Sequence, residues 1–167
     1  MNSEVSILRL LHILPGVLWA GGAVLSTFVI MPIVMRQAPP VRKAVLEPLS
    51  KAFSMYLLAM GAVTIIFGMI LVSRTPGRGY GELFTTGWGW SIGLGMIAAI
   101  VAWVIGLMVG RAGRKMGALG RTVGDGPPTP ELAAEIMATA ARLKLLSRTA
   151  TVLVVFAVCA MAVARWV

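Results

Sequence analysis

The chain's single histidine, His12, lies inside its first long apolar run, between Leu11 and Ile13. An ionisable ring in such a segment is costly to keep in lipid, so it is a functional hypothesis by default. Imidazole is also the commonest metal ligand among side chains. We therefore interpret His12 as a candidate metal ligand, and an axial ligand of haem iron is the leading case.

Residues at helical spacing around His12 have the types that a haem site needs. Steps of three or four place Arg9, His12, Gly16 and Trp19 along one stripe of a helix. We expect Arg9 to pair with a propionate, Gly16 to leave room for the macrocycle and Trp19 to pack on its edge. The chain has no second histidine, so the candidates for a sixth iron ligand are methionines in the outer halves of the other helices, namely Met69, Met96 and Met161. The alternatives are five-coordinate haem and one iron shared by His12 of two protomers.

A simpler interpretation of His12 is that its ring makes a hydrogen bond between two helices. The apolar runs contain no Asp or Glu, which argues against a proton relay built on buried carboxylates. Nothing in the chain resembles a nucleophile–base pair, a phosphate-binding loop or a zinc cluster. Any catalysis would therefore come from a bound cofactor that the protein positions.

The composition is typical of a membrane protein. Of the 167 residues, 58% are hydrophobic and 13% are charged, and soluble domains carry about twice that charged fraction. Four runs are long enough to span the hydrocarbon layer as helices, and they lack the polar alternation of a transmembrane barrel. We predict one all-α domain over residues 1–167, an integral membrane four-helix bundle with spans at about 5–31, 50–73, 86–110 and 145–165.

The formal net charge of +9 is unevenly distributed along the chain. Most Lys and Arg residues lie between the first and second spans and between the third and fourth. The positive-inside rule then places both termini outside and these connections, including about 111–144, in the cytoplasm, where they meet anionic head groups. We expect a multi-pass protein of the inner (plasma) membrane, and no nucleic-acid partner, because no recognition motif accompanies the charge.

Proline and glycine residues predict where the helices bend and end. The first helix is expected from near Ser3 to about Met35, with a bend at Pro15. Pro48 is expected near the first turn of the second helix. Pro130 is expected at the first position of the last helix, which continues well outside the membrane.

The third span begins with small residues four apart, which has two interpretations. Gly87, Ser91 and Gly95 share this spacing, as do Gly89 and Gly93. Small residues at this spacing let membrane helices approach closely. The same surface could instead accommodate a flat cofactor.

The run from Leu11 and His12 through Gly16 to Trp19, Ala20, Gly21 and Gly22 carries a family resemblance. It resembles the first-helix signature of small four-helix membrane proteins, most closely the copper-resistance CopD-like family. HemJ-type protoporphyrinogen oxidases and the membrane domain of cytochrome-linked urate oxidases carry similar runs. The HemJ-like group implies haem b bound by His12, and the CopD-like group implies copper handling.

Three functions therefore stay open at the level of sequence. The first is a b-type haem protein for electron transfer or oxidoreduction near the outer face, with a haem-dependent oxidoreductase as its enzymatic form. The second is a copper-handling protein, although no Met-x-x-Met or His/Met cluster supplies soft ligands. The third is a cofactor-free accessory subunit of a membrane complex. Expected partners are the lipid bilayer and a redox protein, a quinone or a second copy of the chain.

Overall fold

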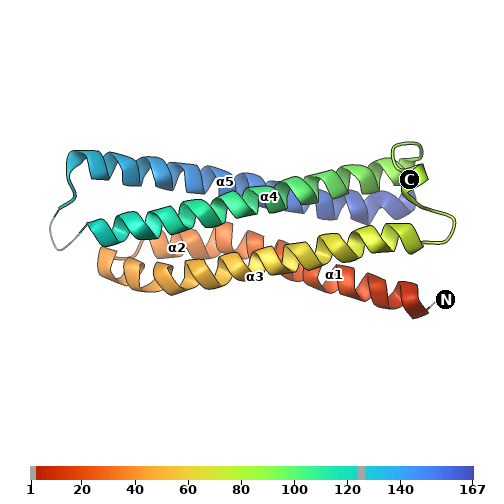
Figure 1. Ribbon diagram of the computed structural model, residues 1–167, viewed down its shortest axis with the longest axis horizontal. Coiled ribbons are helices and arrows are strands. Elements are labelled where there is room, and N and C mark those ends of the chain that lie inside the picture. The colour runs from red at the N-terminus through yellow and green to blue at the C-terminus, as the bar shows by residue number, and fades with distance from the viewer. Residues whose placement is uncertain (1–2, 124–126) are drawn as a thin grey trace.

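The computed structural model describes residues 3–123 and 127–167 as an antiparallel bundle of four long helical segments (Figure 1). The structure also contains two single helical turns. The turn η2 (Tyr80–Glu82) lies in the connection before α4, and η3 (Ala164–Trp166) follows α5. The long segments are α1 (Ser3–Val24) continued by η1 (Leu25–Ile30) and α2 (Met31–Met35), then α3 (Pro39–Arg74), α4 (Gly87–Thr122) and α5 (Pro130–Val163).

All four segments are long and apolar enough to cross a membrane. They have 33 to 37 residues, and the mean hydropathy of their most apolar windows is 2.0 to 2.5. The described residues contain no strand. The predicted all-α four-helix membrane bundle is confirmed. Many large apolar side chains on these helices are exposed, as expected for helices whose outer faces contact lipid.

Two tryptophan rings among small residues form the centre of the bundle. Trp19 of α1 is only 7% exposed and packs with alanines of α4 and with Val154 and Ala157 of α5. A Cβ at Gly61 of α3 would lie 2.8 Å from the Trp103 ring and 2.9 Å from the Trp19 ring. Because Gly61 has no side chain, α3 can come close to both rings, as small residues allow in membrane helices.

The first segment has the predicted ends but contains a π-helical stretch that the sequence analysis did not anticipate. Pro32 follows directly, at the start of α2. Proline has no N–H, and its ring clashes with the carbonyl group four residues earlier in an α-helix. Just before it, the Met31 N–H bonds to the Ser26 carbonyl five residues back, which is the wider π-type turn. The helix thus accommodates the proline by widening.

One prediction about helix ends was wrong, and another was confirmed. Pro48 lies inside α3, because that helix already begins at Pro39. Pro39 and Pro40 are tolerated in the first turn, where the missing N–H groups have no helical partner. The last helix begins at Pro130, as predicted, so the connection at about 111–144 includes the end of α4, which runs to Thr122, and the start of α5. Thr129 accepts a hydrogen bond from the Leu132 N–H at 3.3 Å and caps α5.

The helices are longer than a bilayer is thick. At 1.5 Å per residue a helix of 36 residues measures about 54 Å, and the hydrocarbon layer measures about 30 Å. About 24 Å of α4 therefore extends beyond that layer. In this extension Lys115 of α4 and Glu135 of α5 form an ion pair at 2.8 Å.

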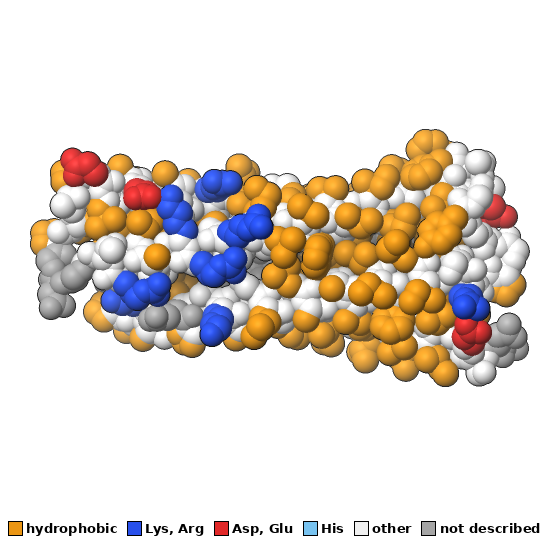
Figure 2. Space-filling model, in the orientation of Figure 1, with side chains coloured by type: hydrophobic (Ala, Val, Ile, Leu, Met, Phe, Trp, Pro, Cys, Tyr) orange, Lys and Arg blue, Asp and Glu red, His pale blue; other side chains and the backbone are white. Residues whose placement is uncertain are grey.

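The two ends of the bundle differ in chemistry. Both termini lie at the same end (Figure 1). Figure 2 shows most Lys and Arg side chains of one face in the half away from the termini, with one at the terminal end beside an acidic side chain, and apolar side chains covering much of the part nearer the termini. At the terminal end Arg78 lies 5.2 Å from the Trp88 ring centre and Arg165 lies 4.8 Å from that of Trp166. Tryptophan is enriched at membrane–water interfaces, so we expect this end of the bundle to lie at one.

Candidate functional site at His12

The His12 ring of α1 is bound to the backbone of α3. Its Nδ1 atom lies 2.8 Å from the Thr64 carbonyl oxygen. A carbonyl oxygen can only accept, so Nδ1 carries the hydrogen and donates it. In a neutral imidazole the other nitrogen, Nε2, then holds a lone pair. The contact therefore selects the tautomer in which Nε2, and not Nδ1, has the free lone pair.

Gly68 makes this contact sterically feasible. It lies four residues after Thr64, on the helical turn that the ring approaches. A Cβ at Gly68 would lie 2.7 Å from His12 Cε1 and 2.8 Å from Nδ1, closer than real Cβ atoms come. The missing side chain therefore leaves the Thr64 carbonyl group open to the ring.

The Nε2 atom is free to bind something else. It makes no hydrogen bond among the described residues, whereas every fully buried side-chain nitrogen or oxygen there has a partner. Nε2 is therefore not fully enclosed by protein. It also lies 3.7 Å from the Cβ position of Gly68, farther than Nδ1, so it is the nitrogen that points away from α3.

Gly16 and Trp19 lie on the same face of α1 as His12, within protein packing. A Cβ at Gly16 would lie 3.3 Å from the Thr64 methyl group, so α3 covers that position. Trp19 lies in the core. In this arrangement both residues serve helix packing, and their contact with a macrocycle stays a prediction.

Arg9 lies three residues before His12, about one turn nearer the terminal end. It is exposed and forms no ion pair with any carboxylate that the structure describes. The neighbouring Glu4 instead pairs with Arg74 at 3.7 Å. Arg9 is thus a cation available to an anionic group close to the His12 ring.

Met96 of α4 lies at a depth similar to that of His12. It is partly buried and seven residues before Trp103, hence on the same helix face. Trp103 donates from Nε1 to the Leu58 carbonyl oxygen at 2.9 Å and contacts Gly61. Because α3 and α4 run antiparallel, the corresponding step of seven residues from Gly61 leads to Gly68, which lies against the His12 ring. Met96 and His12 therefore lie at a similar depth. The depth of Met96 agrees with a ligand role, which stays a prediction.

Protein groups cover the glycine surface of α4. The Phe84 ring covers Gly93, and a Cβ at Gly89 would overlap the Glu82 carbonyl group. Phe84 itself has a positive φ of 64° and meets the Trp90 ring edge-on at 5.1 Å. Gly87 and Gly95 face the C-terminal residue and Met161 of α5. Gly95 therefore packs against α5, whereas Gly87, Gly89 and Gly93 are covered by the connection before α4 and by Val167. Contact of this surface with a flat cofactor stays a prediction.

The sequence analysis missed Thr64 and Gly68, the two α3 residues that hold the His12 ring. Together with Gly61 they form a run of small residues at spacings of three and four. That spacing indicates a close helix contact. It could have identified this face of α3 as the partner of α1, although not the hydrogen bond itself.

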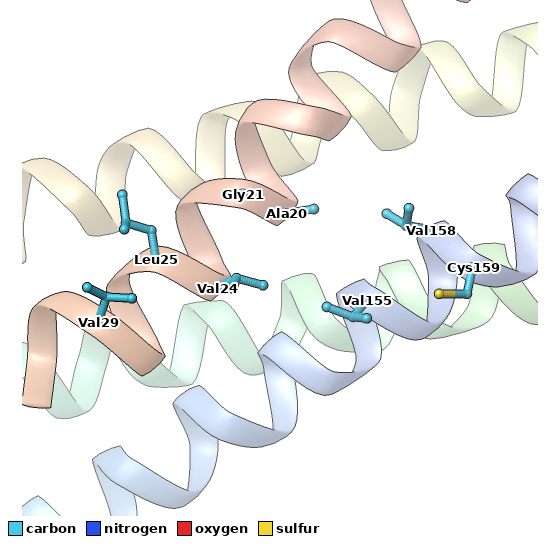
Figure 3. Close-up of a pocket in the computed structure, with 8 residues that line it drawn as sticks. All are labelled: Ala20, Gly21, Val24, Leu25, Val29, Val155, Val158 and Cys159. Carbon is cyan, nitrogen blue, oxygen red and sulfur yellow. The ribbon is translucent and has the colours of Figure 1, made fainter.

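Two apolar grooves flank α1, and neither includes His12. One has a volume of about 490 Å³ and lies between α1 and α3, with Phe53 and Tyr56 on its α3 side. The other has a volume of about 360 Å³ and lies between the first segment and α5 (Figure 3); its lining residues are Ala20, Gly21, Val24, Leu25, Val29, Val155, Val158 and Cys159. The described residues contain no cluster of three His, Cys, Asp or Glu side chains that could bind a metal.

Comparisons with known proteins assign no family to this arrangement. No family model, no curated protein and no solved structure matches the chain. The functional argument therefore depends on the residues themselves.

Proposed function

We propose that this multi-pass membrane protein binds haem b and acts in electron transfer or oxidoreduction near the outer face. His12 would hold the haem iron through Nε2. One observation carries the proposal: the Nδ1–H group of His12 donates to the Thr64 carbonyl oxygen at 2.8 Å. Metal-binding histidines almost always donate their other ring N–H to such an acceptor, which fixes the ring and raises its basicity.

Charge and depth support this site. The positive-inside rule assigns the basic end of the bundle to the cytoplasm and the terminal end to the outside, in a bacterial-type inner membrane. Arg9 then lies at the outer boundary, and His12 lies about 4.5 Å deeper. A propionate that reaches the head-group level would meet the Arg9 guanidinium as a charge-assisted partner.

Each residue of the proposed haem site has its own role. Bound haem supplies the one-electron chemistry. His12 holds the group through Nε2, the Thr64 carbonyl and Gly68 orient the ring, and Arg9 neutralises negative charge at the membrane surface. Met96 is the candidate for the second axial position. A redox protein or a quinone would exchange electrons at the outer end.

Haem content tests the proposal. The full chain, purified in detergent from haem-replete cells, is expected to show a Soret band that is lost in His12→Ala. Gly21→Ala is a matched control on the same helix, because a Cβ there meets nothing within 4 Å. Circular dichroism verifies that each variant is folded. A colourless wild-type protein, or equal haem in His12→Ala, would contradict the proposal.

A cofactor-free accessory subunit is the second candidate, and the His12 contact also favours it. The Thr64 carbonyl already satisfies the ring's donor and connects α1 to α3. Such a hydrogen bond in a membrane contributes about 0.6–1.7 kcal/mol. This function predicts a colourless, metal-free protein whose His12→Ala variant only loses thermal stability. Copper in the wild type that disappears in a His12→Ala/Met96→Ala double variant would instead support copper handling.

A further inference from the structure

The groove between the first segment and α5 has an apolar lining throughout its length. In Figure 3, Ala20 and Val24 on one side and Val158 on the other point toward the space between the helices. Two hydroxyl groups hold the helices together beside it. Thr151 Oγ1 of α5 lies 2.9 Å from Thr27 Oγ1 and 3.4 Å from the Ala23 carbonyl oxygen. These contacts show that Thr151 and Thr27 lie at the same depth in the bundle.

The groove lies in the inner half of the membrane-spanning part. From Arg9 at the outer boundary, the 30 Å of hydrocarbon end about 20 residues later, near Val29. The α1 side of the groove runs from Ala20 to Val29, that is, from about the bilayer centre to the inner boundary. This is the depth of the acyl chains of the cytoplasmic leaflet.

Cations lie on both helices beyond the groove, at different depths: counted from the Thr27–Thr151 contact, Arg148 is three residues and Arg36 nine residues nearer the basic end. Arg36 is seven residues beyond Val29, and Arg148 is seven residues before Val155. Seven residues make nearly two helical turns, so each arginine lies close to the helix face that lines the groove. Both are exposed, and neither forms an ion pair with a carboxylate whose side chain the structure describes. Lys144, one turn beyond Arg148, adds a third exposed cation.

We propose that this groove and its arginines form a binding site for one anionic phospholipid of the cytoplasmic leaflet. An acyl chain lies in the groove, and the phosphate group meets Arg36 and Arg148. The dimensions agree: Ala20 and Arg36 are 16 residues apart, about 24 Å along a helix. Half of a bilayer with its head groups measures about 20–22 Å. This site is independent of haem binding.

Native mass spectrometry of the detergent-purified full chain tests the site. Titration with phosphatidylglycerol is expected to give a one-to-one adduct that phosphatidylcholine gives far less readily. Each arginine near a membrane surface contributes about fivefold to such a preference. An Arg36→Gln/Arg148→Gln variant should therefore lower the preference about 25-fold. Val24→Trp, which enlarges a side chain that points into the groove, should remove the adduct with all charges intact.

The matched control is Arg111→Gln/Arg114→Gln, which removes the same charge from α4, a helix that does not line the groove. This variant should keep the preference within about twofold of wild type. Equal binding of the two lipids, an equal loss in the control, or full retention in Arg36→Gln/Arg148→Gln would overturn the proposal. Competition by soluble glycerol phosphate at the same concentration would also overturn the proposal, because binding would then depend on the head group alone and not on an acyl chain in the groove.

Discussion

The His12 ring can occupy its position because Gly68 has no side chain. The ring edge fills the space where a Cβ would be, and the Thr64 carbonyl oxygen accepts the Nδ1 hydrogen. The histidine itself could be identified from the sequence, since a lone imidazole among apolar residues is conspicuous. Its acceptor could not, because every residue has a carbonyl group and only the three-dimensional contact shows which one is used.

A methyl group at Gly68 should disturb this contact. In Gly68→Ala the new Cβ would lie within 2.8 Å of two ring atoms, so the ring must move and its hydrogen bond weakens. Overpacking of this kind costs about 1–3 kcal/mol. We expect a lower melting temperature in detergent and weaker haem retention. Thr64→Val is the control and should retain haem, because the hydrogen-bond acceptor is a backbone atom. Equal haem retention in Gly68→Ala and wild type would show that the contact between His12 and Thr64 does not contribute to haem binding.

At the scale of helices, apolar run length predicted the four spans well, whereas their ends depended on local chemistry. Prolines at the start of α3 and the Thr129 cap of α5 extended both helices beyond the apolar runs. The π-helical stretch could not be predicted from run length, because it arises where Pro32 meets a continuous helix. It lies beside the Thr27–Thr151 contact between α1 and α5.

The Thr27–Thr151 pair should stabilise the α1–α5 contact. Thr151 is only 2% exposed, and its hydroxyl lies 2.9 Å from Thr27 Oγ1. We expect Thr151→Val to lower the free energy of unfolding by about 1 kcal/mol, and Thr149→Val, at an exposed position, to leave it unchanged. In a double-mutant cycle Thr27→Val should cost less in the Thr151→Val background. Strict additivity would show that the hydroxyls do not interact.

At the scale of the whole molecule, the position of charge sets the orientation. The basic end and the end with both termini are opposite each other (Figures 1 and 2). Composition was enough to predict a membrane bundle, because large apolar side chains remain on the outer faces. The packing between helices was less predictable, since glycines such as Gly61 and Gly95 contact residues distant in sequence.

Cysteine accessibility tests this orientation. In a Cys159→Ser background, Thr85→Cys lies in the connection before α4 at the terminal end, and Thr122→Cys lies at the basic end. An impermeant maleimide applied to intact cells should label Thr85→Cys and leave Thr122→Cys unlabelled until the cells are opened. The reverse pattern would place His12 on the cytoplasmic side and contradict the proposed outer site.

The most direct test of the central claim is an experimental density map of the chain purified from haem-replete cells. The account predicts a porphyrin whose iron lies about 2 Å from His12 Nε2, as for other metal–imidazole bonds, while Nδ1 keeps its contact with the Thr64 carbonyl oxygen. A well-resolved map with only side chains or lipid beside Nε2 would contradict it and leave His12 as a contact between two helices.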